Sequence, residues 1–173
     1  MNTDQKSNKS KTKGKPLKRH PALVPLSKDH HFGLLLCWKI RTGLGKDISP
    51  ERISAYVQYF FDHHLLQHFS EEENYVFSLL DAQDEKRKKA EKQHRTLKLL
   101  RERLEKEPWQ LRSLLHLIEK ELETHIRFEE RELFPYMQEK LSDEQLAVLE
   151  QQLEEIHASV TEQWDDPFWT KQS

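Results

Sequence analysis

Two stretches of the chain repeat one arrangement of histidine and glutamate. Both read His-x3-Glu-Glu-x2-(Val or Leu)-Phe, with His68, Glu72, Glu73, Val76 and Phe77 in the first and His125, Glu129, Glu130, Leu133 and Phe134 in the second. Residues four apart lie one above the other on a helix, so the histidine and the first glutamate of each repeat point toward the same place. A chain this rich in histidine and glutamate contains roughly one His-x3-Glu by chance. The shared context of the two repeats is therefore what indicates a pair of chelating sites.

Each of the first four predicted helices places one histidine in its apolar stripe, where leucine would otherwise be expected. These residues are His30, His68, His94 and His125. A single histidine in such a position is more often a hydrogen-bonded core residue than a metal ligand. Because the repeat falls on the second and fourth helices, it implies a pseudo-twofold bundle in which His30 and His94 complete two equivalent half-sites. The sequence thus predicts a dinuclear metal centre.

The predicted ligands are His30, His68, Glu72, His94, His125 and Glu129. Four neutral imidazoles and two carboxylates suit two iron ions best, with manganese or zinc as alternatives. The glutamates can bridge the ions and offset part of their charge, which would be unfavourable to bury alone. Cys37 is the only cysteine, so one chain cannot form a Cys-type zinc site or an iron-sulfur ligand set. Glu73 and Glu130 lie one residue further round their helices and are expected outside the ligand set.

The elements that must position these ligands are predicted to be helices. The chain has 4 Gly and 34% charged residues, a composition typical of helices rather than of a sheet protein. Five helices are expected. The first begins at Leu26, with Ser27 as N-cap, and ends at Gly43 and Gly45, and the second runs from Ser49-Pro50 to near Asp81. The third spans about Asp84 to Lys106, the fourth runs from about Trp109 until Pro135 kinks or breaks it, and the fifth starts at the capping box Ser142–Gln145 and continues through about Val160. Short connections favour an all-α, up-down-up-down antiparallel four-helix bundle with an additional C-terminal helix. The segment from Trp164 to Trp169 is expected to pack on the outside.

The N-terminal stretch differs in composition from the rest of the chain. Its basic residues are Lys6, Lys9, Lys11, Lys13, Lys15, Lys18 and Arg19, and almost no apolar residue lies among them. Such a segment cannot offset its ordering entropy, so residues 1–19 are predicted to be a basic flexible tail and residues 20–173 to form the bundle. The formal net charge of -2 gives no overall attraction to nucleic acid. Neither a membrane span nor a secretory signal is recognisable, which predicts a cytoplasmic protein.

From about Leu26 to Tyr136 the sequence resembles the hemerythrin-like, or HHE cation-binding, family. The resemblance rests on Asp29-His30, on the two His-x3-Glu motifs and on the single His94 between them. In that family these positions hold an oxo- or hydroxo-bridged di-iron centre, which implies the same six ligands here. The resemblance implies a non-haem di-iron protein that binds or senses a small diatomic ligand such as O2 or NO, or handles iron and oxidative stress. The sequence does not identify a protein partner, predicts no membrane association and makes a nucleic-acid partner an unfavoured alternative.

One departure from the family's oxygen carriers concerns the third helix. Those members place two histidines four residues apart there, whereas Lys98 follows His94 by four residues and Ala90 precedes it by four. The chain is more similar to bacterial members with four His and two Glu. These include proteins linked to repair of iron-sulfur clusters under nitric oxide stress, which carry an extra cysteine-bearing N-terminal segment, whereas the N-terminal tail here has no cysteine.

Two other classes of protein remain open on the sequence. A di-iron oxidoreductase of ferritin-like type would use Glu-x-x-His, a spacing found at Glu91 to His94 and at Glu154 to His157. A metal-free interaction bundle would leave the duplicated motif unexplained. His64 could orient His68 or act as a further ligand, and His31 competes with His30 for the inward position. The remaining histidines are expected at the surface or in satisfied positions: His20, His63, His116 and His157.

Overall fold

Helices make up the fold, and no strand occurs in the part of the chain that the structure describes. The computed structural model describes residues 18–170. The prediction of an all-helical protein is confirmed for this range. Most of the predicted basic tail lies outside it, but Arg19 is included, and its guanidinium donates to the carboxylate of Glu130 at 2.7 Å. Among residues 18–170, no helix combines the length and apolarity that crossing a bilayer requires.

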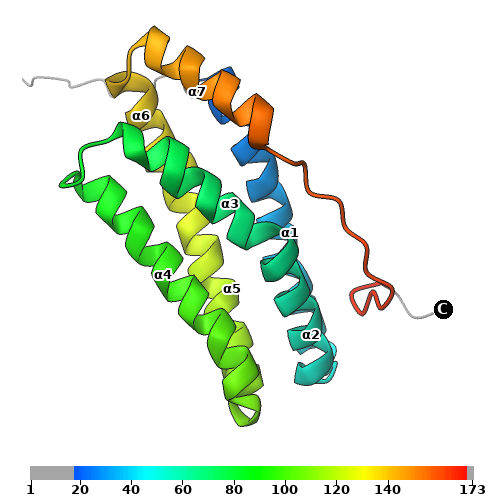
Figure 1. The fold of residues 1–173 in the computed structure, drawn as a ribbon. Coiled ribbons are helices and arrows are strands. Elements are labelled where there is room, and N and C mark those ends of the chain that lie inside the picture. The colour runs from blue at the N-terminus through cyan, green and yellow to red at the C-terminus, as the bar shows by residue number, and fades with distance from the viewer. Residues whose placement is uncertain (1–17, 171–173) are drawn as a thin grey trace, which may run out of the picture.

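The helices follow the predicted order along the chain (Figure 1). Their bounds are α1 Val24–Gly45, α2 Pro50–Phe60, α3 Leu66–Glu71, α4 Glu85–Lys106, α5 Leu111–Phe128, α6 Phe134–Lys140 and α7 Asp143–Ile156. The second predicted helix consists of α2 and α3 joined by a π-helical turn, Phe61–Leu65, and extended by a second one, Glu72–Val76. The fourth predicted helix consists of α5 and α6, joined by the π-helical turn Glu129–Leu133. Pro135 thus falls in the first turn of α6, where its missing N–H is tolerated.

Most of the predicted helix starts are confirmed by their caps. The side chains of Ser49 and Asp84 accept hydrogen bonds from the first turns of α2 and α4, and Ser142 forms the expected capping box with Gln145. The predicted Ser27 cap is wrong. The helix begins earlier, at Val24, and the Ser27 hydroxyl instead donates to Glu130 at 2.7 Å. The end of α7 at Ile156 also falls short of the predicted Val160.

Helix α5 lies at the centre of the packing, because α1, α2 and α4 all contact it. Helix α7 crosses one end, against the 3-10 turn Pro21–Leu23 and the π-helical turn Glu72–Val76 (Figure 1). The buried apolar residues form two clusters. The larger, which we call the α2-end cluster, includes Ile40, Ile53, Leu97, Leu115 and Ile118. The smaller, the α7-end cluster, includes Leu26, Val76, Ala90, Leu133 and Leu149.

The segment after α7 packs more deeply than the sequence predicts. Phe168 is buried in the α2-end cluster, and Trp164 and Trp169 lie against the same cluster. A Cβ atom at Gly43 would stand only 2.8 Å from the Phe168 ring, so this close approach depends on glycine within α1. The prediction that the segment packs on the outside is therefore wrong for Phe168. The reason is that α1 offers a glycine-lined gap that the apolar pattern does not reveal.

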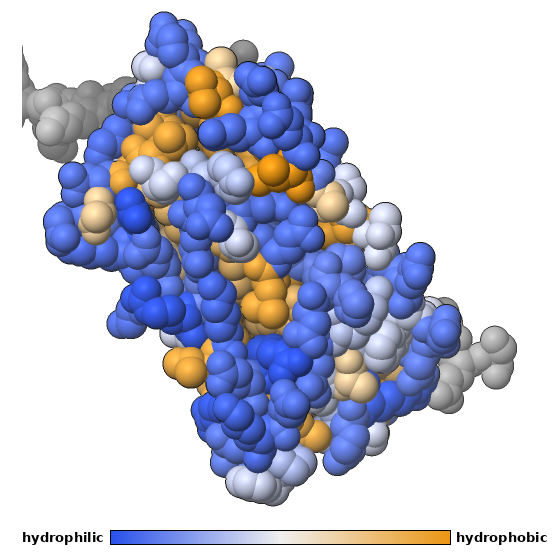
Figure 2. Space-filling view, viewed as in Figure 1, coloured by the Kyte–Doolittle hydropathy of each residue, from blue (hydrophilic) through white to orange (hydrophobic). Residues whose placement is uncertain are grey.

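Hydrophilic residues dominate the face seen in Figure 2, with smaller hydrophobic areas among them. The large apolar side chains that are exposed are Trp38, Leu66, Leu99, Trp109, Leu117, Val148 and Ile156.

Candidate metal centre

The structure brings all six predicted ligands together. They form two groups of four, in which one potential ligand atom from each residue lies within 4.8 Å of the others. The first group is His30, His68, Glu72 and Glu129, and the second is Glu72, His94, His125 and Glu129. Both glutamates belong to both groups. The arrangement therefore offers two adjacent positions for a metal ion, with the two carboxylates between them.

The ligand atoms face one another at short distances. His30 Nε2 lies 3.0 Å from Glu129 Oε2, and His68 Nε2 lies 3.3 Å from Glu72 Oε1. On the other side, the Nε2 atoms of His94 and His125 are 3.1 Å apart. Two basic ring nitrogens at that distance can share only one proton, whereas a cation between them would satisfy both lone pairs.

The centre is buried, and six of the polar atoms that face its interior lack a hydrogen-bond partner. Glu72, His94, His125 and Glu129 have no exposed surface, while His30 and His68 are 3% and 4% exposed. Although His30 Nε2 lies 3.0 Å from Glu129 Oε2, no contact within residues 18–170 gives hydrogen-bond geometry to any of the four carboxylate oxygens or to Nε2 of His30 and His68. Buried polar atoms are normally satisfied, since leaving one unpaired costs about 1–3 kcal/mol. Six unpaired atoms that converge on one point fit a bound cation.

Each of the four histidine rings is held from behind by a second side chain. The Nδ1 atom of His30 lies 2.7 Å from Glu130 and that of His94 lies 2.8 Å from Glu73. The Nδ1 atoms of His68 and His125 each lie 3.2 Å from an oxygen, and the residues that supply it are Asp29 and Gln93, respectively. An acceptor at Nδ1 fixes the ring so that Nε2 carries the lone pair, which is the usual support of a metal-binding histidine. All four Nε2 atoms are thereby directed into the centre.

The local backbone explains how both glutamates reach the same place. In each repeat the histidine belongs to an α-helix and the first glutamate opens a five-residue π-helical turn, Glu72–Val76 or Glu129–Leu133. The wider turn shifts the register of the helix after the glutamate, and such turns are frequent at functional sites. The sequence repeat is therefore also a repeat of backbone conformation.

Burial and mutual charge alter the acidity of the ligands. Burial, together with the charge of Glu72, raises the pKa of Glu129 to about 7. Burial and the nearby His94 lower the pKa of His125 well below its usual value, so this ring is a neutral ligand at neutral pH. Burial alone would lower the pKa of His68, but the charge of Glu72 and the hydrogen bond to Asp29 outweigh it and raise that pKa to about 9. Two adjacent buried carboxylates thus resist ionising together unless a cation compensates them.

The other histidines lie outside the two groups. His31 is exposed, so the inward position on α1 belongs to His30. His64 lines a cavity of about 110 Å³ beside Asp29 and His68, and it is neither a member of the groups nor hydrogen-bonded to His68. His63 and His116 are exposed, whereas His157 bonds Glu71 at 2.8 Å.

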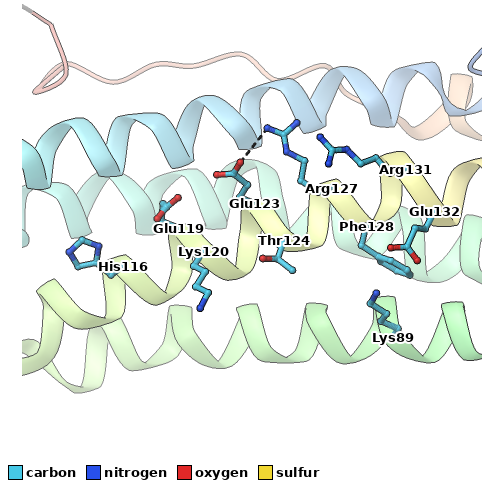
Figure 3. Close-up of a pocket in the computed structure, with 10 residues that line it drawn as sticks. All are labelled: Lys89, His116, Glu119, Lys120, Glu123, Thr124, Arg127, Phe128, Arg131 and Glu132. Carbon is cyan, nitrogen blue, oxygen red and sulfur yellow. Dashed lines mark hydrogen bonds and ion pairs between the residues drawn. The ribbon is translucent and has the colours of Figure 1, made fainter. Parts of the chain in front are cut away.

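A larger groove lies elsewhere, along α5 and facing α4. Its volume is about 670 Å³, and it shares no residue with the two groups (Figure 3). Its cationic and anionic side chains alternate, and Lys89 covers the ring of Phe128 at 3.9 Å. Nothing in this groove resembles a set of metal ligands.

Sequence reasoning missed the roles of Asp29 and Gln93. A signal was present, because each immediately precedes the single inward histidine of its helix, His30 on α1 and His94 on α4. Their contacts reach across to the neighbouring helix, however, which the spacing within one helix does not show. Glu73 and Glu130 lie outside the two groups, where the sequence places them, and each supports a ring.

No family model matches the chain, and neither the curated proteins nor the solved structures include a significant match. The class of protein is therefore defined by the fold and the site alone. Within residues 18–170 the chain is an all-helical protein with a buried cluster of histidines and glutamates that could hold a metal.

Proposed function

We propose that this protein is a non-haem di-iron protein of the hemerythrin-like type, which binds or senses a small diatomic ligand such as O2 or NO. The observation that carries the proposal is the sharing of Glu72 and Glu129 between two four-residue groups. A mononuclear site needs only one such group. Two groups joined by two carboxylates fit a pair of ions that the glutamates bridge.

The donor set favours iron over other metals. In each position two imidazole nitrogens and two carboxylate oxygens are available, and no thiolate takes part, because Cys37 is buried against the backbone of Glu119 instead. Mixed nitrogen and oxygen ligands suit iron, with manganese and zinc as alternatives that geometry alone does not exclude. Iron would supply redox chemistry and open coordination positions, while the protein supplies fixed imidazoles and a dry environment.

The proposal includes an up-down-up-down arrangement of four helices with α7 appended. It is supported by the ligands themselves, which come from α1, from the α2–α3 helix, from α4 and from α5 with its π-helical turn. A bundle that directs one ligand face of each helix inward is the usual framework for a dinuclear centre in helical proteins.

A ferritin-like oxidase or peroxidase is less well supported. Such an enzyme would direct Glu91 toward the centre along with His94, but the Glu91 carboxylate bonds Arg87 at 2.8 Å. Glu154 is exposed on α7, and neither glutamate belongs to the two groups. We therefore place ligand binding ahead of catalysis.

Lys98 bears on which ligand chemistry to expect. It occupies the position where oxygen carriers of the family have a second histidine on this helix, and its ammonium group bonds Glu73 at 2.9 Å. The metal position formed by Glu72, His94, His125 and Glu129 consequently has only two nitrogen ligands, His94 and His125. An oxygen-rich environment favours ferric iron, so we expect the reduced protein to oxidise in air without releasing bound oxygen.

The test is anaerobic loading with ferrous iron followed by exposure to air or to NO, monitored by absorbance and electron paramagnetic resonance. Air should convert the spectrum irreversibly, and NO should give new bands at a stoichiometry set by the iron content. His68→Ala is the negative control, and His116→Ala, on the outer groove, is the matched positive control. Unchanged spectra of the iron-loaded protein with both gases would contradict the proposed function. Recovery of the reduced spectrum on evacuation would show reversible oxygen carriage instead.

A further inference from the structure

The four side chains that contact the Nδ1 atoms of the histidines, which we call the supports, are related by the same pseudo-twofold arrangement as the ligands. In each repeat the second glutamate bonds the Nδ1 atom of a single histidine, Glu130 with His30 and Glu73 with His94. The residue that precedes each single histidine faces the Nδ1 atom of a repeat histidine. The four histidines and the four residues that contact their Nδ1 atoms therefore form matched pairs across the two metal positions. Each residue of one metal position can be compared with its counterpart in the other.

The two glutamate supports are balanced in charge. Glu130 accepts from the guanidinium of Arg19 at 2.7 Å, and Glu73 accepts from the ammonium of Lys98 at 2.9 Å. Each glutamate thus has one cationic partner from another part of the chain. The charge that they present to His30 and His94 is the same on both sides.

The other pair of supports is not balanced. His68 faces a carboxylate, Asp29, whereas His125 faces the neutral amide of Gln93, and both distances are 3.2 Å. Among the hydrogen-bonded supports of the four rings, this is the one difference in formal charge within the described residues. The second oxygen of Asp29 faces His157 Nε2 at 3.7 Å, and that ring is bonded through Nδ1 to Glu71 at 2.8 Å.

The charge of a support changes the donor strength of the ring. A carboxylate at Nδ1 draws the N–H proton toward itself and leaves Nε2 a stronger donor, whereas an amide oxygen does so less. Removing such a support commonly lowers metal affinity about 10–100-fold.

We propose that the two metal positions are inequivalent, and that the position between His30 and His68 binds a divalent cation first because Asp29 supports His68. This inference rests on the proposed function only in that the centre must bind metal. It assigns Asp29 and Gln93 as the positioning residues that set the order of filling.

The experiment uses Co2+ as the probe, the full-length chain and a buffer above the pKa of His68, so that no proton competes with the cation for its Nε2 atom. Crystals grown with one equivalent of Co2+ should show anomalous scattering mainly between His30 and His68, at an occupancy about ten times that of the other position. The double substitution Asp29→Asn with Gln93→Glu exchanges the two supports and keeps the total charge. It should move the main peak to the position between His94 and His125.

A matching titration in solution separates the two binding steps. The wild-type chain should bind Co2+ in two steps that differ about tenfold or more, and Asp29→Asn should weaken the first step about tenfold. Gln93→Glu alone should strengthen the second step. Leu99→Ala, on the exposed side of α4, is the control and should change neither step.

The outcomes separate this inference from the proposed function. Equal peaks, or a stronger peak between His94 and His125 in the wild-type chain, would overturn the inference while leaving a dinuclear centre intact. The absence of Co2+ from both positions would overturn both. If the exchanged variant does not fold, the wild-type map decides the question by itself.

Discussion

The buried histidines and glutamates of the candidate metal centre, which we call the polar layer, differ from the two apolar clusters in how their burial affects stability. On α4, His94 stands between Ala90 of the α7-end cluster and Leu97 of the α2-end cluster, and the ligands on the other helices are flanked in the same way. The clusters gain stability by removing apolar surface from water. The layer between them buries six atoms that no described residue satisfies. One fold thus contains regions whose composition follows from packing and a region whose composition does not.

In a helical bundle, a functional site is best sought where the buried residue types do not serve packing. A periodic apolar stripe explains why a helix packs, and any hydrophobic residue of suitable size would serve. Histidine and glutamate at the same stripe positions weaken the packing, so they need another reason to be there. The tests below separate the two regions by measuring metal content and stability in the same variants.

The largest expected effect is loss of metal from the polar layer. His68→Ala or His125→Ala removes one of the two nitrogen ligands of one position and should abolish stable dinuclear binding. His116→Ala is the matched control, since that ring lines the outer groove. Elemental analysis after identical loading provides the measurement. Full metal content in either ligand variant, or loss in the control, would show that the site is assigned wrongly.

A substitution in an apolar cluster should have the opposite profile. Ile118 is fully buried in the α2-end cluster, so Ile118→Ala should lower the free energy of unfolding by about 2–5 kcal/mol. Its metal content per folded chain should stay at the wild-type level. Urea denaturation and elemental analysis of the same preparation check both statements. A folded Ile118→Ala protein that has lost its metal would mean that the two regions are not separable.

The pH dependence of metal affinity should report on the layer alone. Without metal, His68 has a pKa of about 9 and Glu129 a pKa of about 7, and a bound cation must displace both protons. Against the effect of burial, contacts with Glu129 and Glu130 raise the pKa of His30 as well, so affinity should fall as the pH falls, by about tenfold per unit for each proton that the cation displaces. Competition with a chelator of known pH dependence measures this. An affinity that is constant from pH 9 to pH 6 would contradict the coupled release of protons.

The smallest expected effect is on the stability of the metal-free chain when both bridging glutamates become apolar. Replacing buried charges by hydrophobic residues of similar size is often neutral or stabilising by about 1–4 kcal/mol. Above the pKa of His68, where that ring is neutral, Glu72→Leu combined with Glu129→Leu should thus leave metal-free stability unchanged or slightly raised, although metal no longer binds. Thermal melting with and without metal makes the comparison. A loss of more than about 2 kcal/mol would mean that the glutamates stabilise the fold by themselves.

Much of the fold could be predicted from the sequence because apolar spacing and caps are local signals. Ser49, Asp84 and Ser142 start helices as their types predict. The π-helical turns could not be predicted, since a five-residue turn leaves no clear mark in the apolar period. The burial of Phe168 was missed for a similar reason, because its partner, Gly43, is distant in the chain.

The candidate site, like the fold, could be predicted from the sequence only in part. The repeat indicated four of the six residues that the structure brings together, because two copies of one motif exclude a chance match better than either copy alone. His30 and His94 were predicted from their places in the apolar stripes of the first and third helices. The supports of the rings required the fold. Asp29 and Gln93 face histidines on other helices, and only the packing of α1 against its neighbours shows that contact.

The stoichiometry of bound iron decides whether the buried centre holds two metal ions. Protein loaded anaerobically with ferrous iron and freed of excess by gel filtration should contain about two iron ions per chain, because two groups share the two carboxylates. His116→Ala should give the same ratio. A reproducible ratio of one, or a preference for zinc with no retained iron, would contradict a di-iron centre.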